Sequence, residues 1–476
     1  MTQIASQSKD FPQWYQDVVD KAELAQHSKV KGCMVIRPYG YAIWELVQAE
    51  LDRRIKAAGV KNAYFPLFIP QSFLTREKNH VKGFAPECAV VTHGGGKELA
   101  EPLVVRPTSE TIIYDTYSDW IHSYRDLPLL INQWANVVRW EMRTRPFLRT
   151  TEFLWQEGHT VHATKEDAER EVARALKMYQ DFDREFLALP VLTGTKSPKE
   201  TFAGADYTRT TEALAKDGKV IQAGTSHLLG QTFAKAFNIQ FQDEKGEMQY
   251  AWQTSWGLST RIIGTIIVCH GDEKGLVLPP RVAPVQVVIV PIYKTEEEKA
   301  AVLGVCLKVE ESLKSQGVRT EVDARENATP GYKFNEWELK GVPIRIELGP
   351  RDLAEKKAVY VKRYNGEKSS MGIDLLETTI PGLLEQIQGE MLELAEKRLA
   401  ENIREAETLE KMLAILDEQG GFVKAAWAGT EEDEKKIQDK TKATIRIVSD
   451  EKWPKERACI FTGKKTDTMV YFARAY

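Results

Sequence analysis

The chain has 476 residues, of which 42% are hydrophobic and 28% charged, and its formal net charge is −4. These values suit a protein of about three folded domains and argue against a general nucleic-acid coat. No apolar run reaches the roughly twenty residues that cross a bilayer, and the N-terminus lacks a secretory pattern, so no membrane partner is expected. Five scattered cysteines fit reduced thiols and predict a cytoplasmic location.

The first part of the chain is predicted to mix helices with antiparallel strands. Apolar spacing indicates helices over 11–25, 40–58, from 107 past 120, and 165–188. Between them, 62–70 reads as a buried strand interrupted by Pro66, and strands dominate 90–105. No Rossmann-like repeat is present, so we expect an α+β domain over residues 1–278.

The proline-rich stretch 275–284 is predicted to be a linker. Strands and helices alternate after it, which predicts a compact α/β domain with a mostly parallel sheet over 283–385. A single long charged helix is expected over 383–416, and residues 386–476 form the third predicted domain. The acidic run 430–436 is interpreted as a solvated turn.

The segment Val138–His159 carries the clearest chemical signal. Alternation predicts one strand over 136–142, a turn at Pro146, and a second strand that ends near His159. Four arginines stand against one glutamate between residues 139 and 149. Guanidinium groups bind phosphate oxygens in pairs, and Phe153 could stack on a base, so the segment predicts a nucleotide clamp. Taken alone, it also fits a solvated surface ribbon or a nucleic-acid patch.

The segment resembles motif 2 of the class II aminoacyl-tRNA synthetases, with Arg139-Trp140-Glu141 followed by a variable loop and a strand that bears Phe153. The whole chain resembles prolyl-tRNA synthetases of the form common to archaea, eukaryotes and some bacteria. This resemblance implies an antiparallel-sheet catalytic core, an α/β anticodon-binding domain and a small α+β C-terminal domain. The stretch between Glu157 and Gly257 is too short for the large editing insertion of the other bacterial form.

The resemblance further implies a proline–tRNA ligase. Such an enzyme activates L-proline with ATP to form prolyl-adenylate and transfers the prolyl group to the 3′ end of tRNA(Pro). The expected partners are tRNA(Pro), L-proline, ATP with Mg²⁺, and a second copy of the chain in a homodimer. The dimer interface is expected at the helix 40–58 and the strand 62–70, which resemble motif 1.

Two arginines are expected to carry catalysis. By resemblance, Arg139 bridges the α-phosphate and the amino-acid carboxylate, and Arg261 in the GLSTR string is the motif 3 arginine that holds the γ-phosphate. Alone, Arg261 would be interpreted as a residue that caps a helix. The other implied nucleotide contacts are Glu141, Arg149, Thr150, Phe153, Gln222 and Thr225.

The proline pocket is expected to begin at the Thr108-Ser109-Glu110 string, which matches the Thr-x-Glu loop of the family. Glu110 is expected to pair with the ring nitrogen, although the string also fits an ordinary helix start. The remaining implied proline contacts, which would serve equally well as core residues, are Arg139, Trp155, His159, Phe202 and His227.

Three features are assigned less directly. The anticodon candidates Glu338, Arg345, Arg351 and Asp352 resemble residues that read guanines, although ordinary surface charge explains them as well.

The family's C-terminal four-cysteine zinc site falls on Ala428, Asp433, Cys459 and Thr462; because one thiolate cannot complete it, no zinc and no other protein metal site are expected. The resemblance also implies that the carboxylate of the final residue, Tyr476, points toward the active site.

Two alternatives remain open. One is a catalytically silent synthetase-like tRNA-binding protein, although Arg139, Glu141 and Arg261 are all retained. The other is a sister synthetase for threonine or another small amino acid, against which the Thr-x-Glu loop argues because threonine enzymes recruit zinc. Arg143 and Arg145 are interpreted either as contacts of the tRNA acceptor end or as solvated residues.

Overall fold

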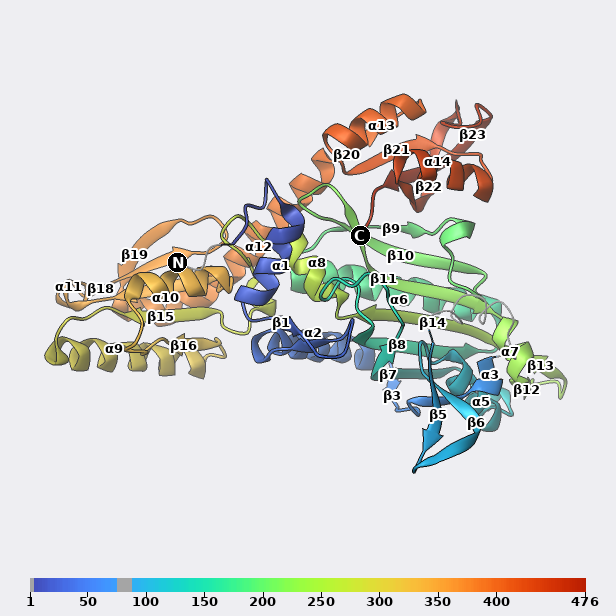
Figure 1. Ribbon diagram of the computed structural model, residues 1–476, viewed down its shortest axis with the longest axis horizontal. Coiled ribbons are helices and arrows are strands. Elements are labelled where there is room, and N and C mark those ends of the chain that lie inside the picture. The colour runs from blue at the N-terminus through green and yellow to red at the C-terminus, as the bar shows by residue number, and fades with distance from the viewer. Residues whose placement is uncertain (1–3, 75–87) are drawn as a thin grey trace.

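The computed structural model describes residues 4–74 and 88–476 (Figure 1). The main element is an eleven-stranded sheet in the order β20-β21-β23-β22-β9-β10-β11-β14-β8-β7-β3. Seven of its strands belong to the first part of the chain: β3 (Lys61–Asn62), β7 (Leu129–Val138), β8 (Glu152–His162), β9 (Val191–Thr195), β10 (Tyr207–Leu214), β11 (Val220–Gly230) and β14 (Trp252–Ser259). All neighbours among them are antiparallel except β3 and β7.

Helices pack on this sheet and form the main core. Buried residues of α1 (Phe11–Lys21), α2 (Pro38–Ala57), α6 (Lys165–Leu187) and α8 (Arg261–His270) form one hydrophobic cluster with β10, β11 and β14. Helix α6 shows why such segments form: Thr164 caps its first turn by accepting from the Asp167 backbone, and its apolar face is buried. The predicted helix over 165–188 is confirmed.

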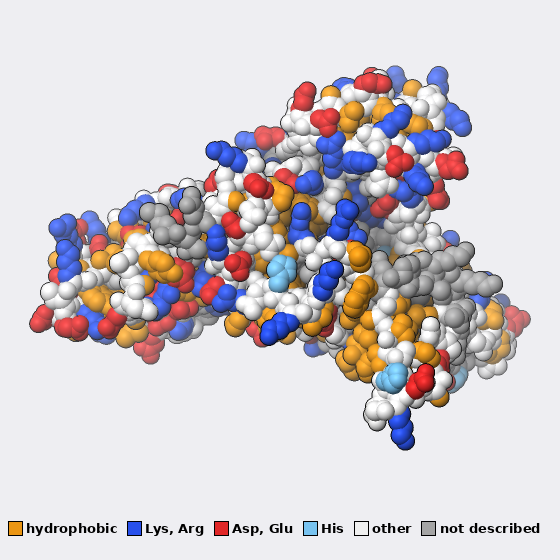
Figure 2. Space-filling model, in the orientation of Figure 1, with side chains coloured by type: hydrophobic (Ala, Val, Ile, Leu, Met, Phe, Trp, Pro, Cys, Tyr) orange, Lys and Arg blue, Asp and Glu red, His pale blue; other side chains and the backbone are white. Residues whose placement is uncertain are grey.

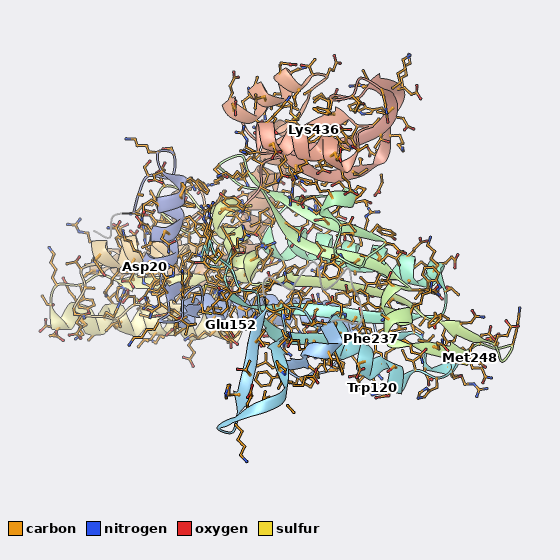
Figure 3. All side chains as sticks on the ribbon, turned by 45° about the vertical axis from the view of Figure 1, so that its right-hand side comes forward. Asp20, Trp120, Glu152, Phe237, Met248 and Lys436 are labelled. Atoms are coloured by element: carbon orange, nitrogen blue, oxygen red, sulfur yellow. The ribbon has the colours of Figure 1, made fainter. Side chains whose placement is uncertain are left out.

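A second core lies at the far end of the sheet. In this core, α5 (Glu110–Trp120) packs against α7 (Thr232–Phe237). Trp120, the last residue of α5, and Phe237, the last residue of α7, lie near each other in Figure 3. The prediction that this helix starts at Pro107 is wrong, because α5 begins at Glu110. Strands near this region are β4 (Phe68–Pro70), β5 (Ala89–Gly94), β6 (Lys97–Val105), β12 (Gln240–Gln242) and β13 (Met248–Tyr250), with the short helix α3 (Gln71–Leu74). The two-stranded pair β1 (Ala25–His27) and β2 (Met34–Ile36) packs instead with the main core beside α1.

The α/β domain lies at one end of the molecule (Figure 1). Its five-stranded sheet has the order β16-β15-β17-β18-β19. The expectation of a mostly parallel sheet holds for the first three strands only, since β18 and β19 are antiparallel to their neighbours. Its elements are β15 (Val287–Pro291), α9 (Glu296–Ser315), β16 (Thr320–Val322), α10 (Pro330–Leu339), β17 (Ile344–Leu348), α11 (Pro350–Ala354), β18 (Lys357–Lys362) and β19 (Lys368–Gly372).

The single long helix predicted over 383–416 is wrong. Helix α12 (Leu376–Glu401) ends at Glu401 with Asn402 as its C-cap, β20 (Ile403–Glu405) pairs with β21 (Phe422–Ala426), and α13 (Leu409–Glu418) follows β20. The hydrogen bonds that β20 makes with β21 outweigh the helical propensity of the charged residues in this segment. The predicted domain boundary at 385 therefore falls inside α12.

The C-terminal part contributes the other four strands of the eleven-stranded sheet. Its strands β22 (Thr444–Ala458) and β23 (Lys465–Ala473) form a long hairpin, and β22 meets β9 through Val448 and Thr195. The acidic run 430–436, expected as a turn, opens helix α14 (Glu431–Thr441), where Thr430 caps the first turn. The fold class predicted from the sequence is confirmed. Within the described ranges, no helix is long and apolar enough to cross a membrane.

Candidate active site

A cavity of about 220 Å³ opens over β8, β14 and β11. A second cavity of about 570 Å³ adjoins it and shares Arg139, Phe153, Ser259 and Arg261 with it. The first cavity is lined by most of the predicted site residues: Thr108, Glu110, Arg139, Phe153, Trp155, His159, Phe202, Gln222, Thr225, His227 and Arg261. The predicted residues Glu141, Arg149 and Thr150 line the second cavity.

Strand register brings these side chains to one face. On β8, Trp155, Glu157 and His159 are two residues apart, so they share a face, as Thr225 and His227 do on β11. Gly257 of β14 lies between Glu157 and Thr225 in register. The absence of a side chain at Gly257 leaves room for a ligand over the centre of the sheet.

The end of β7 differs from the prediction. The first strand of the arginine-rich hairpin was expected to include Arg139 and Glu141, but β7 ends at Val138, and β8 begins only at Glu152. Val138 and Glu152 face each other, so residues 139–151 form a loop; most of this loop lines the second cavity, and Arg139 also lines the first. The four arginines of the segment therefore lie on a loop at the end of the sheet, and their guanidinium groups can approach a phosphate in the second cavity from several sides.

Arg139 is held in place by several contacts. Its backbone N–H donates to Thr151 at 2.8 Å, and its Nε donates to the Pro107 carbonyl at 2.9 Å. Its guanidinium lies 5.4 Å from the Phe153 ring centroid and 5.5 Å from that of Trp155. These contacts orient a permanent positive charge at the boundary between the two cavities.

Arg261, the first residue of α8, is the second cation at this boundary. Its Nε donates to the Leu148 carbonyl at 3.2 Å. Burial and, next, the charge of Arg139 lower the pKa of Arg261 to about 10, so it stays protonated at neutral pH. Two arginines that destabilise each other's charge favour an anion between them.

The rest of the loop lines the second cavity. Arg149 donates to Glu141; although burial opposes ionisation, this contact holds the pKa of Glu141 below its usual value. Thr150 donates to the carbonyl of Glu152 at 2.8 Å. Arg145 contacts protein as well as lining the cavity: its guanidinium lies 5.5 Å from the ring centroid of Tyr476.

Tyr476 returns to the catalytic sheet. Its backbone N–H donates to Val220, and Lys219 Nζ lies 5.1 Å from its ring. The chain end thus lines the second cavity. Figure 2 shows lysine and arginine side chains gathered in the middle of this face, below the C-terminal part, which suits a polyanionic ligand.

The other half of the first cavity mixes carboxylates with rings. Glu110 is buried at the start of α5 and accepts a hydrogen bond from Thr108. His227 Nδ1 lies 2.8 Å from Thr208 Oγ1, and its ring lies 4.7 Å from that of Phe202. Burial lowers the pKa of His227 to about 3, so this imidazole is neutral.

Several lining residues were not predicted as site residues. The sequence signal for Glu157 is its alternation with Trp155 and His159, and the signal for Glu200 is its place two residues before Phe202. Gly257, Leu258 and Ser259 belong to the GLSTR string, from which only Arg261 is predicted as a site residue. The other unpredicted residues have no sequence signal of their own: Thr208, Ala223, Gly224, Ser255 and Trp256.

The anticodon candidates lie in the α/β domain, far from this cavity in sequence. Arg345 pairs with Glu347 at 3.0 Å, and its guanidinium lies 4.4 Å from the Phe334 ring. Glu338 pairs at 2.8 Å with Lys274, which follows α8 of the first part of the chain. Asp352 accepts from the backbone of Gly349 and caps α11, whose first turn also includes the exposed Arg351.

The four positions at which the resemblance places zinc ligands, Ala428, Asp433, Cys459 and Thr462, lie in the C-terminal part. Cys459 is buried and accepts from the Thr462 backbone at 3.5 Å, while Asp433 caps α14. Within residues 4–74 and 88–476, no group of three or more His, Cys, Asp or Glu side chains could hold a metal ion.

Comparison with known proteins identifies the three parts of the chain. A model of the tRNA synthetase class II core domain (G, H, P, S and T) matches residues 91–270, an anticodon-binding domain model matches 286–383, and a model of the prolyl-tRNA synthetase C-terminal domain matches 409–476.

Full-length relatives agree. Proline–tRNA ligases of Chlorobium phaeovibrioides and Chloroherpeton thalassium are 53% and 54% identical over 481 residues, with 99% of each chain covered. A solved structure of prolyl-tRNA synthetase from Cryptosporidium parvum, complexed with halofuginone and AMPPNP, is 45% identical and superposes with a TM-score of 0.95 over 100% of both chains. The chain therefore belongs to the prolyl-tRNA synthetase family of class II aminoacyl-tRNA synthetases.

Proposed function

We propose that this chain is a proline–tRNA ligase, which joins L-proline to ATP as prolyl-adenylate, releases pyrophosphate, and transfers the prolyl group to the 3′ end of tRNA(Pro). The observation that carries the proposal is the presence of Thr108, Glu110, Arg139 and Arg261 around one cavity. Amino-acid activation needs a carboxylate to pair with the ammonium group of the amino acid, and Glu110 supplies it. It also needs positive charges to hold the triphosphate of ATP, and Arg139 and Arg261 supply them.

In the activation step, the carboxylate of proline attacks the α-phosphorus and pyrophosphate leaves. No protein nucleophile is needed, because positioning and electrostatic stabilisation supply the rate. Arg139 would bridge the proline carboxylate and the α-phosphate, while Arg261 would hold the γ-phosphate. An arginine at each end of the triphosphate would bend it and expose the α-phosphorus to in-line attack.

The nucleotide would lie along both cavities. Phe153 and Glu141 would flank the adenine, and Arg149 and Thr150 would contact the nucleotide beside them. The side chains of Gln222 and Thr225 would complete the contacts from β11. The support for this arrangement is that these residues line the two adjoining cavities.

Proline would occupy the half of the first cavity that contains Glu110. Its secondary ammonium group would pair with Glu110 and Thr108, and its ring would pack against Trp155, His159 and Phe202. Because His227 is neutral, it would add no positive charge that competes for Glu110.

Mg²⁺ fits the donors available beside the triphosphate. The ion prefers oxygen ligands and often binds through substrate phosphates with one or two protein ligands. Glu141 and Gln222 offer such oxygens here. Bound Mg²⁺ would neutralise charge on the phosphates. No zinc is proposed, because Ala428 and Thr462 offer none of the thiolate, imidazole or carboxylate ligands that build a four-coordinate zinc site.

The remaining assignments concern the rest of the molecule. We propose a catalytic domain over 1–278, an anticodon-binding domain over 283–385 and a C-terminal domain over 386–476. In the second, Arg345 and Arg351 would pair with guanine acceptors, and Glu338 and Asp352 would accept from guanine donors. Arg143 and Arg145 would meet the acceptor end of the tRNA at the edge of the second cavity.

The proposed form is the one common to archaea, eukaryotes and some bacteria, without the large editing insertion, and the proposed location is the cytoplasm. A homodimer is proposed through α2 and the strands beside it. Its support is the exposure of large apolar side chains in these segments, at Tyr41 of α2 and at Tyr64 and Phe68. Figure 2 also shows hydrophobic side chains gathered over β5 and β6.

Proline-dependent ATP–pyrophosphate exchange tests the proposal. The purified protein should catalyse exchange with proline and not with threonine or other amino acids of similar size. A protein that binds tRNA but shows no exchange would instead be the catalytically silent alternative. Faster exchange with another amino acid would overturn the assignment of the substrate.

A further inference from the structure

His159 is the centre of a buried hydrogen-bonded network beneath the proposed proline pocket. Its Nε2 lies 2.9 Å from Glu157 Oε2, and its Nδ1 lies 3.0 Å from the hydroxyl of Tyr114. Tyr114 is fully buried on α5, one turn after Glu110. The rings of Tyr114 and His159 meet edge to face, with their centroids 5.6 Å apart.

The Glu157 side of the network determines where the imidazole hydrogen lies. Glu157 Oε1 accepts from Ser109 Oγ at 2.5 Å and from Gln133 Nε2 at 2.8 Å. Although burial opposes ionisation, His159 and these two donors hold the pKa of Glu157 below its usual value. An ionised carboxylate can only accept, so His159 Nε2 carries a hydrogen and donates it.

In the neutral ring, Nδ1 is therefore an acceptor and needs a donor. Tyr114 supplies it, because burial raises the pKa of its hydroxyl well above 10 and keeps the hydroxyl protonated. If the ring is protonated, Nδ1 donates to the same oxygen. A hydroxyl at this position satisfies both states, which no apolar side chain does.

We propose that Tyr114 is a positioning residue that fixes the orientation of the His159 imidazole and, through it, the selectivity of the pocket for an apolar ring. With both nitrogens bonded to protein, His159 offers the ligand only carbon edges. A prolyl ring can pack on such a wall, whereas a hydroxyl group would be buried there without a partner. This inference rests on the proposed function, because it names the feature that selects the substrate of the same site.

The same helix provides a matched control. Tyr117 is also fully buried, and its hydroxyl donates to the backbone carbonyl of His159 at 3.1 Å. Tyr114→Phe and Tyr117→Phe each remove one buried hydroxyl that contacts His159. Only Tyr114→Phe removes the hydrogen bond to the imidazole ring of His159. If the orientation of this ring determines selectivity, Tyr114→Phe should change it and Tyr117→Phe should not.

The test uses ATP–pyrophosphate exchange with proline and with 4-hydroxy-L-proline, which has the same ring with one added hydroxyl. For Tyr114→Phe, we expect the KM for proline to rise about tenfold and the preference for proline over hydroxyproline to fall about tenfold, while kcat and the KM for ATP stay within about twofold. Tyr117→Phe should keep the KM for proline and the preference within about twofold of the original protein.

A second readout is the ¹⁵N spectrum of histidine-labelled protein, with the His159 signals identified by their loss in His159→Asn. The original protein and Tyr117→Phe should show one bonded form of the ring, and Tyr114→Phe should shift the Nδ1 signal. Equal kinetics and equal His159 spectra in the two tyrosine variants would overturn this inference alone. An original protein that shows no exchange with proline would overturn the proposed function and this inference with it.

Discussion

A buried ion-pair cluster joins the catalytic sheet to the C-terminal part and provides the sharpest test of how these parts cooperate. Glu212 of β10 is completely buried and accepts from Arg446 Nε and Nη2 at 3.0–3.1 Å, as well as from Lys196. Although burial opposes ionisation, Arg446 and Lys196 hold the pKa of Glu212 below its usual value. Arg446→Met removes one of these cations while keeping most of the side-chain volume.

The expected cost follows from the charges. Two unit charges about 4 Å apart attract each other by about 4 kcal/mol at the effective dielectric constant of about 20 that suits protein sites. Breaking a buried pair by removing one partner typically costs about 3–5 kcal/mol, because the remaining charge stays buried. Because Lys196 still pairs with Glu212 after the substitution, we expect a smaller cost for Arg446→Met: the hydrogen bonds that it loses to a charged group should lower the local free energy of unfolding of the β9–β22 junction by about 1.5–3 kcal/mol.

A matched pair crosses the same junction at the surface. Arg209 of β10 pairs with Asp450, whose side chain is 62% exposed. Because water screens this pair, Arg209→Met should cost less than about 1 kcal/mol. Both variants remove an arginine that links the two parts, but only Arg446→Met removes a buried one. A difference between them therefore reports the effect of burial.

Native-state hydrogen exchange is the suitable assay, since a protein of several domains has no single free energy of unfolding. The amides of β22 and β23 should exchange much faster in Arg446→Met than in Arg209→Met, with the amides of β8 and β14 changing less. Equal exchange rates in the two variants would refute the reasoning that the buried cluster holds the junction.

Three further predictions concern the site and the α/β domain. Glu110→Gln should lower kcat/KM for proline about ten- to a hundredfold, since a hydrogen bond to a charged group is lost, with the KM for ATP unchanged. Arg261→Lys should raise the KM for ATP about tenfold, because lysine lacks the forked donors that hold a phosphate, and an equal rise in the KM for proline would contradict its assigned place. Asp323 lies buried in the α/β domain; although burial opposes ionisation, hydrogen bonds from Arg325 and Trp337 Nε1 lower its pKa to about 2. It should contribute about 1–2 kcal/mol of stability above pH 4 that is lost as the pH falls through about 2. The destabilisation of Asp323→Asn in urea should therefore shrink from pH 5 to pH 3, and a constant difference would contradict this linkage.

The parts of the site that lie close together in sequence could be predicted well. Arg139, Phe153 and Trp155 stand within one short stretch, and alternation along β8 correctly places Trp155 and His159 on the same face. The length of the loop 139–151 could not be read from alternation, because the pattern of apolar and charged residues continues past the point where β7 and β8 stop pairing.

Other features depend on contacts between distant segments. Tyr114 and Gln133 are ordinary core residues in the sequence, and only the packing of α5 and β7 against β8 brings both to the buried network of Glu157 and His159. The break of the charged helix at Asn402 has the same origin, since β20 exists only because β21 pairs with it. Local propensity cannot report such pairings.

The continuity of the catalytic sheet with the C-terminal strands also affects how the protein is made. About 250 residues separate Thr195 from its partner Val448, so β9 is synthesised long before β22. At about 5–20 residues per second, the ribosome needs roughly 12–50 s to make the intervening chain. During that interval β9 is an open edge, the kind of strand on which other chains can pair. Chaperone protection of the nascent chain should therefore matter most after the catalytic strands emerge and before the final hairpin does.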